Sequence, residues 1–233
     1  MARRFSVPRA SRDVPPIDDS ALALRTATLG PGMSWALGEP EDDVLLYVAA
    51  GAGILSLAET SEPVRGGRAG LVRAGEEALL QATDPLELVV MSVGPGVDRH
   101  APMGPRALTA SLEDADKGQA TGTRSFQVLF DATNGSTRAT LFAGYVPRGK
   151  APWHYHLYDE IVWVPKGPGR LHIDETVEEL GPGAAFRLRP REVHIVENAS
   201  TEEMTIIGLF TPAGSPAAAY LAPEVAAGYR FAG

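Results

Sequence analysis

Two segments decide the fold and chemistry expected of this chain: Trp153-His154-Tyr155-His156-Leu157-Tyr158-Asp159-Glu160 and, 34 residues after Glu160, His194-Ile195-Val196-Glu197-Asn198. They contain three of the five histidines in the chain. Alternate residues of an extended strand point to the same face, so His154 and His156 project together. Neutral imidazoles with one carboxylate suit a divalent transition metal. The spacing predicts that His154, His156, Glu160 and His194 converge on one ion.

The composition limits the class of protein. A chain of 233 residues can form one large domain or two small ones, and an apolar content of 44% excludes a disordered chain. The net charge of −8 argues against nucleic acid or an anionic membrane as a partner, since no basic stripe stands out to neutralise phosphates. We therefore expect a small-molecule partner, with no nucleic acid and no membrane.

Targeting and redox signals are few. The one basic cluster, Arg3, Arg4, Arg9 and Arg12, lacks the apolar segment of a signal peptide and predicts a solvated arm. No run of eighteen apolar residues occurs, so we expect a cytoplasmic protein. With no cysteine, the chain has no disulfide, thiolate metal site or cysteine nucleophile.

The pattern of apolar residues predicts a mostly β protein. The 25 glycines and 19 prolines separate short β-branched and aromatic runs, such as those at 44–48, 161–164 and 204–210. Such runs joined by turns are typical of many short strands.

The chain also repeats itself. Gly51 and Gly67 recur as Gly167 and Gly183, each at an offset of 116 residues, within similar surroundings. A period of half the chain predicts duplication of one all-β domain. We expect an N-terminal barrel with its arm over 1–102, a linker over 103–122 and a metal-binding barrel with a C-terminal tail over 123–233. Ser111 is expected to cap a short helical turn in the linker, and the stretch from Ala217 to form a short outer helix.

These motifs resemble those of the cupins, a family of small jelly-roll barrels. The first reads His154-x-His156-x3-Glu160-x6-Gly167, and the second reads Gly183-x5-Arg189-x-Arg191-x2-His194-x3-Asn198. The chain departs from the family only at turn positions, where Arg148 replaces a glycine and Arg189 and Arg191 replace a proline and a glycine.

The resemblance covers both halves and implies a bicupin, an all-β fold of two tandem barrels with few short helices. It also implies that His154, His156, Glu160 and His194 are the ligands of one metal. Ligand softness allows Mn, Fe, Ni, Co or Zn. No catalytic residue is assigned, and a homodimer is one possible assembly by resemblance.

The N-terminal half provides an internal comparison. The offset places Gly38, Pro40, Val44 and Ala78 opposite the four predicted ligands, and none of them can bind a metal through its side chain. The same domain is therefore expected to fold without a metal, with the N-terminal barrel covering an apolar sheet of the other.

Several residues near the motif have both a structural and a functional interpretation. His172 is predicted to be a satisfied strand residue, His100 a linker residue and Asn198 a structural hydrogen-bonding residue. Arginines 187, 189 and 191 alternate before His194; we favour solvated side chains over a carboxylate clamp, with Phe186 and Leu188 facing the core. Tyrosines 145, 155 and 158 are core or pocket aromatics.

The leading functional hypothesis is a one-metal enzyme acting on a small oxygen-rich or carboxylated metabolite, with a leaning toward a dioxygenase-like oxidoreductase. A non-catalytic metal-dependent binding protein is the main alternative. A ureidoglycine aminohydrolase-like hydrolase is weaker, because in that family the glutamate precedes the histidines whereas Glu160 follows them. A storage protein like the seed bicupins fits the duplication but not the retained ligands.

Overall fold

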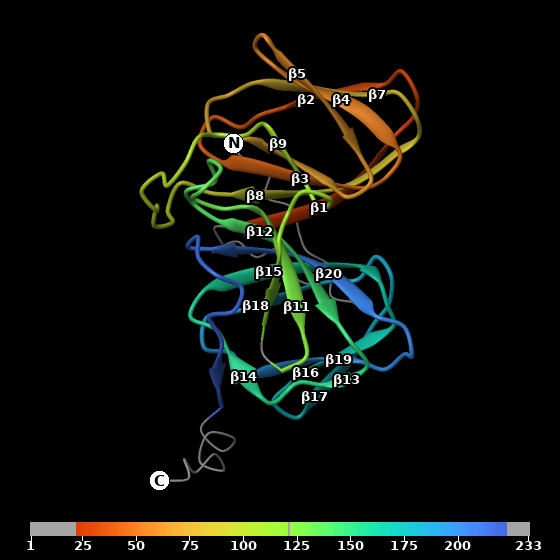
Figure 1. Cartoon of the computed structure of the whole chain (residues 1–233), viewed down its shortest axis with the longest axis vertical. Coiled ribbons are helices and arrows are strands. Elements are labelled where there is room, and N and C mark those ends of the chain that lie inside the picture. The colour runs from red at the N-terminus through yellow and green to blue at the C-terminus, as the bar shows by residue number, and fades with distance from the viewer. Residues whose placement is uncertain (1–21, 121, 223–233) are drawn as a thin grey trace.

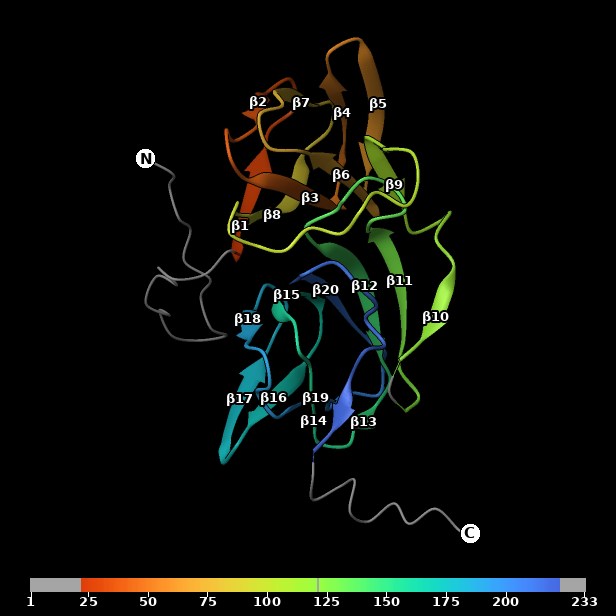
Figure 2. The ribbon, with the colours of Figure 1, turned by 90° about the vertical axis from the view of Figure 1, so that its left-hand side faces the viewer.

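The structure is a computed structural model that describes residues 22–120 and 122–222. The described residues form two barrels built from antiparallel strands, stacked along the long axis of the molecule (Figures 1 and 2). No helix in the described part of the chain is long and apolar enough to cross a membrane. The predicted all-β fold of two tandem barrels is confirmed.

The N-terminal barrel consists of two sheets. One has the order β1 (Leu22–Leu29), β8 (Leu86–Val93), β3 (Asp43–Ala50), β6 (Arg68–Val72) and β9 (Thr109–Ser111). The other has the order β2 (Ser34–Leu37), β7 (Ala78–Ala82), β4 (Ala52–Leu57) and β5 (Thr60–Arg65).

The C-terminal barrel has the same plan with added edge strands. Its larger sheet has the order β10 (Lys117–Gln119), β11 (Ser125–Phe130), β12 (Thr140–Val146), β20 (Met204–Thr211), β15 (Asp159–Lys166) and β18 (Ala185–Leu188). The other has the order β17 (Thr176–Leu180), β16 (Gly169–Ile173), β19 (His194–Asn198), β14 (His154–Tyr155) and β21 (Tyr220–Leu221), and β13 (Gly149–Lys150) also pairs with β19.

Alternation along the strands builds one core inside each barrel and another between them. In β15, Val162 and Val164 face the interior of the C-terminal barrel, whereas Ile161 and Trp163 belong to the core shared with the N-terminal barrel. Burial of apolar side chains between the two larger sheets holds the barrels together. The N-terminal barrel thus covers an apolar face of its partner, as predicted.

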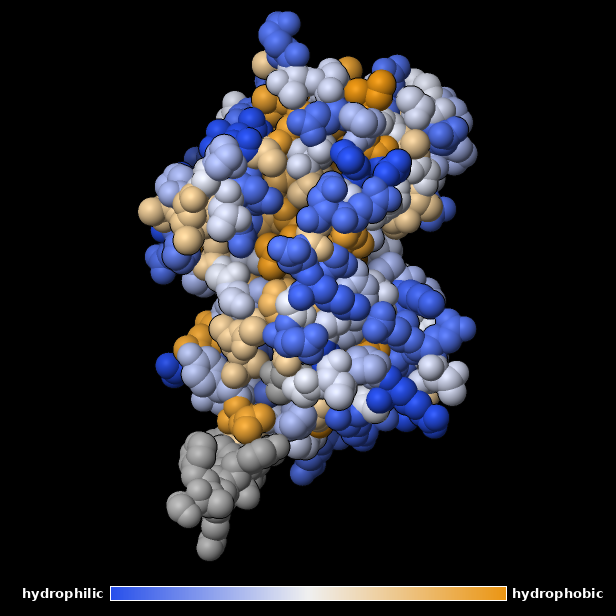
Figure 3. Space-filling view, in the orientation of Figure 1, coloured by the Kyte–Doolittle hydropathy of each residue, from blue (hydrophilic) through white to orange (hydrophobic). Residues whose placement is uncertain are grey.

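The outer surface of the two barrels mixes polar and apolar residues. On the face seen in Figure 3, hydrophilic residues are spread over both barrels and separate small apolar areas.

The repeat is visible in the strand registers. Val44 pairs with Val72, and Glu160 pairs with Leu188 at the same positions 116 residues later. Gly53↔Ala82 likewise recurs as Gly169↔Asn198. The predicted duplication is therefore present in the pairing of the strands.

The register departs from the uniform offset at the first predicted ligand. Ser34↔Gln81 and Lys150↔Glu197 agree with an offset of 116, but Leu37 pairs with Ala78 whereas His154 pairs with His194. One extra residue therefore lies between Lys150 and His154. The structural counterpart of His154 is Leu37, which corrects the sequence-based match to Gly38.

The expected linker contributes strands to both barrels. Strand β9 pairs with β6 of the N-terminal barrel, and β10 pairs with β11 of the C-terminal barrel. Between them, Glu113 N donates to Ser111 Oγ at 3.1 Å, so Ser111 caps a turn but no helix follows.

The predicted helix from Ala217 is wrong for residues 217–222, because a turn there leads into β21 (Tyr220–Leu221). The rest of that stretch and the basic N-terminal cluster lie outside the described residues.

Candidate metal centre

Three of the four predicted ligands form a buried cluster inside the C-terminal barrel. His154 and His194 are directly paired on β14 and β19, and His156 follows β14. One nitrogen from each ring lies within 4.8 Å of the corresponding nitrogens of the other two. All three side chains are buried, which is unusual for histidine without a binding role or a hydrogen-bonding partner.

Backbone carbonyls orient two of the rings. His154 Nδ1 lies 2.9 Å from the carbonyl oxygen of Pro152, and His194 Nδ1 lies 2.8 Å from that of Glu192. Because a carbonyl oxygen only accepts, Nδ1 carries the proton in both rings and Nε2 keeps its lone pair. This second hydrogen bond is the usual means of orienting a metal-binding imidazole.

The surroundings keep these imidazoles neutral. Burial lowers the pKa of His154 to about 4, and burial together with the neighbouring histidines lowers the pKa of His194 well below its usual value. A neutral imidazole is the form that binds a metal. The donor set therefore fits a divalent transition metal such as Mn, Fe, Ni, Co or Zn.

Glu160 lies beside this cluster on β15. It is buried, and its Oε2 is 3.2 Å from His156 Nδ1. The group of converging ligand atoms consists of the three histidines, so a direct bond from Glu160 to a metal stays a prediction.

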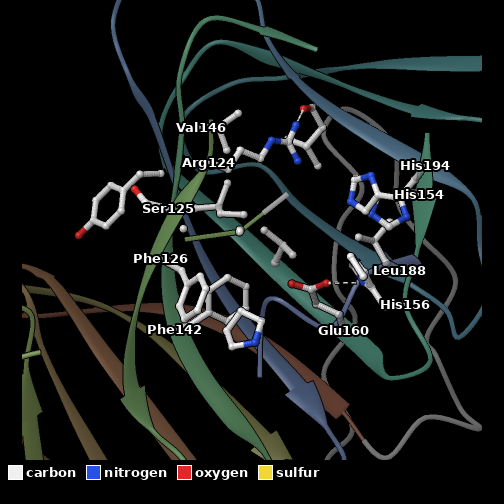
Figure 4. Close-up of a pocket in the computed structure, with 18 of the residues that line it drawn as sticks. Arg124, Ser125, Phe126, Phe142, Val146, His154, His156, Glu160, Leu188 and His194 are labelled. Carbon is white, nitrogen blue, oxygen red and sulfur yellow. Dashed lines mark hydrogen bonds and ion pairs between the residues drawn. The ribbon is translucent and has the colours of Figure 1, made fainter. Parts of the chain in front are cut away.

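The cluster opens onto a pocket whose empty space, with the open solvent at its mouth included, is about 600 Å³ (Figure 4). Its walls are mainly apolar, with side chains that include Phe126, Phe142, Val146, Val162, Phe186, Leu188, Val196 and Ile206. Tyr158 also lines it, with its ring stacked on those of His156 and Phe210 at centroid distances of 4.4 and 4.0 Å. Such a cavity with a few polar groups is typical of a small-molecule site.

Arg124 is a pocket residue that the sequence did not reveal. It precedes β11, and its Nη2 donates to the carbonyl oxygen of Val196. No motif surrounds it, and its place in the pocket depends on how β11 pairs with β12, so local sequence carried no signal for it.

Three of the structural predictions are confirmed. His172 faces the outside of the sheet, where its Nε2 lies 2.7 Å from Glu197 Oε2. Asn198 Nδ2 donates to the carbonyl oxygens of Val146 and Glu202, at 2.8 and 2.6 Å, and fixes a turn. His100 lies in the connection between the barrels, where its backbone N donates to Thr137 O at 2.7 Å.

The three arginines before His194 differ from one another. Phe186 and Leu188 do face the core, as predicted, but Arg187 is not solvated, because its Nε donates to Asp159 Oδ1 at 2.7 Å and its side chain is 10% exposed. Arg191 has a φ of 67° and donates its backbone N to His156 O at 2.7 Å. Arg191 thus adopts the left-handed backbone conformation expected of the glycine that it replaces in the second motif.

The tyrosines have separate roles. Tyr145 and Tyr158 line the pocket, as predicted. The prediction is wrong for Tyr155, which stacks on Tyr220 at a centroid distance of 5.5 Å outside the barrel. The Tyr145 hydroxyl donates to Gln127 Oε1 at 2.5 Å.

The corresponding place in the N-terminal barrel is apolar. Leu37, Val44 and Ala78 are all buried within its core. Among the described residues, the three histidines of the C-terminal barrel are the one cluster able to hold a metal.

A comparison with known protein families matches the part of the chain that holds the site. Residues 141–210, which contain all four predicted ligands, match the model of the cupin domain. This shows that the C-terminal barrel contains a cupin domain, and the two barrels with the structural likenesses below show that the chain has the fold of a bicupin.

Solved structures share the fold at low sequence identity. Oxalate decarboxylase from Bacillus subtilis at pH 4.6 matches with a TM-score of 0.72 and 14% identity, over 89% of this chain and 73% of its own. AerE from Microcystis aeruginosa matches with a TM-score of 0.70 and 13% identity, over 91% of this chain and 100% of its own. No curated protein sequence matches the chain significantly.

Proposed function

We propose that the chain is a metal-dependent enzyme that converts a small carboxylated metabolite at one divalent transition metal in its C-terminal barrel. The observation that carries this proposal is the convergence of three buried imidazoles, two of which have a pKa lowered by burial, on a mainly apolar pocket. A purely structural metal would not require an adjoining cavity.

The proposed ligands are His154, His156, His194 and, as the fourth, Glu160. When bound, the metal would supply Lewis acidity toward a substrate oxygen or a place for dioxygen. Glu160 is the one carboxylate among the described residues that line the pocket. Its carboxylate also lies near His156 Nδ1, so it orients that ring and is placed to accept a proton from a bound substrate.

The fold alone does not choose the reaction. One of the similar structures of Bacillus subtilis oxalate decarboxylase is described for its Mn(II) centres, which supports manganese as the first metal to test here. The dioxygenase-like chemistry expected from the sequence requires dioxygen, whereas a decarboxylation without net oxidation does not. Measuring turnover with and without dioxygen distinguishes the two.

The test begins with the full chain purified without added metal. We expect about one transition-metal ion per chain by elemental analysis, and conversion of a small carboxylate in a panel assayed with and without dioxygen. The His154→Ala and His194→Ala double variant should lose both metal and turnover. A chain without stoichiometric metal would contradict the proposal.

His172→Ala is the matched control, because His172 belongs to the same barrel but faces outward and bonds Glu197. It should keep its metal. Metal-dependent binding without conversion across the panel would instead favour the non-catalytic binding protein.

A further inference from the structure

We propose that Arg124 binds the carboxylate of the substrate and that the apolar walls select a monocarboxylate with a compact apolar body. This inference rests on the proposed function and names the substrate class of the same site. It separates the expected substrate from oxalate, which carries two carboxylates and no apolar part.

The position of Arg124 is fixed by a backbone contact. Its Nη2 donates to the carbonyl oxygen of Val196, two residues beyond His194 on β19. Figure 4 shows the side chain reaching from just before β11 into the pocket, on the side where His154 and His194 lie. One hydrogen bond to a carbonyl leaves other N–H groups of the guanidinium for a ligand.

The charge of Arg124 has no protein counter-ion in the described part of the chain. Ion pairs there join other arginines, such as Arg138 with Asp43 and Arg187 with Asp159, and Glu160 lies beside His156 instead. Burial lowers the pKa of Arg124 to about 10, and no neighbouring acid offsets that effect. A cation in an apolar pocket is costly unless an anion joins it, so the site favours an anionic ligand.

The number of charges favours one carboxylate over a phosphate. Arg124 is the single arginine or lysine among the described residues of the lining. A planar guanidinium matches a carboxylate through parallel hydrogen bonds. A phosphate dianion would need further donors, and Glu160 would repel a second anionic group placed near it.

The apolar part of the ligand is inferred from the pocket wall formed by Phe126 and Phe142. Phe142 lies against Gly208, where an added Cβ would come within 2.4 Å of its ring and 3.0 Å of Glu160 Oε1. Gly144 likewise has no room for a side chain, because an added Cβ would lie 2.8 Å from Ile206. The two glycines let the Phe142 ring lie in the pocket, where with Phe126 it offers an aromatic surface near the metal ligands.

The experiment measures binding of phenylacetate to the full chain by calorimetry, with the metal content determined for each sample. Phenylacetate should bind at least about tenfold more tightly than acetate, oxalate or the uncharged phenylacetamide. Equal or tighter binding of oxalate or acetate would overturn the apolar part of the inference.

Arg124→Gln removes the charge but keeps a donor for Val196 O. It should weaken phenylacetate binding by about tenfold or more, leave phenylacetamide binding unchanged and keep the metal content. Arg124→Lys, which keeps the charge, should restore part of the affinity. Arg170→Ala, which alters an exposed arginine paired with Glu179, should behave like the wild type.

The outcomes separate the two proposals. Loss of metal from the wild-type chain counts against the metal enzyme, whereas unchanged phenylacetate affinity in metal-bearing Arg124→Gln counts against Arg124 alone. Thermal unfolding of each variant checks that it is folded. No binding of phenylacetate to the metal-bearing wild type would also overturn the inference.

Discussion

His154 and His194 face each other as a cross-strand pair on β14 and β19, with ring centroids 4.5 Å apart. In the N-terminal barrel the same place is filled by Leu37 paired with Ala78. An apolar pair in one copy of the domain thus corresponds to two of the proposed metal ligands in the other. The difference between the barrels lies in side chains on a shared frame.

This correspondence predicts that the ligands can be replaced without loss of the fold. A His154→Leu and His194→Ala double variant copies the N-terminal pair. It should bind no metal yet unfold at a denaturant concentration no lower than that of the metal-free wild type, because two desolvated imidazoles are removed. Elemental analysis and urea titration test this. A variant that fails to fold would show that the histidines are needed by the barrel itself.

The buried imidazoles predict a pH dependence for the metal-free chain. Since burial lowers the pKa of His154 to about 4 and that of His194 well below its usual value, these two histidines bind more protons in the unfolded chain than in the folded one below about pH 6.5. Stability should therefore fall as the pH drops from about 6.5 toward 4, with no contribution from these groups above that range. Thermal unfolding at several pH values measures the effect.

The control for this dependence is the same double variant, which lacks both groups. It should lose less stability over the interval. An equal loss in variant and wild type would assign the effect to other residues.

A buried ion pair near the contact between the barrels is a second source of stability. Arg138 Nη1 donates to Glu41 O at 2.6 Å and lies 3.5 Å from Asp43 Oδ1, and these two side chains are 3% and 6% exposed. Arg138→Ala leaves Asp43 buried without its partner and should lower the free energy of unfolding by about 3 kcal/mol. Urea titration tests this, with the exposed Arg170→Ala as a control that should change little.

Arg191 holds a left-handed backbone conformation without being glycine. With a φ of 67°, the residue carries strain that glycine would relieve, although glycine also has more freedom in the unfolded chain. Arg191→Gly should raise the free energy of unfolding by about 0.5–1 kcal/mol. Denaturant titration measures it, and a loss of stability would mean that the arginine side chain contributes more than the strain costs.

Much of the fold followed from local patterns. Alternating apolar residues predicted strands because successive side chains of a strand point to opposite faces. The offset of 116 residues predicted two similar domains without any knowledge of contacts. The turn capped by Ser111 is present as predicted, whereas the helix predicted from Ala217 is replaced by a turn and a strand as far as residue 222. Pairing with a sheet edge outweighed helix propensity there, as β21 shows against β14.

The site was partly within reach of the sequence. His154, His156 and His194 were identified because histidines two residues apart on a strand share a face. The match of His154 to Gly38 was wrong, because an extra residue before His154 shifts the register and no sequence offset records it. Glu160 was predicted as the fourth ligand; its carboxylate lies beside His156, and its bond to a metal stays a prediction.

The sequence by itself determined the all-β class, the duplication and the histidines able to bind a metal, since each depends on residues near one another or on a regular period. Tertiary structure alone decided that Arg124 shares their pocket, that Arg187 pairs with Asp159 and that the N-terminal equivalent of the site is packed with apolar side chains. These relations join strands far apart in the chain, and their geometry depends on sheet order and register, which no local pattern specifies.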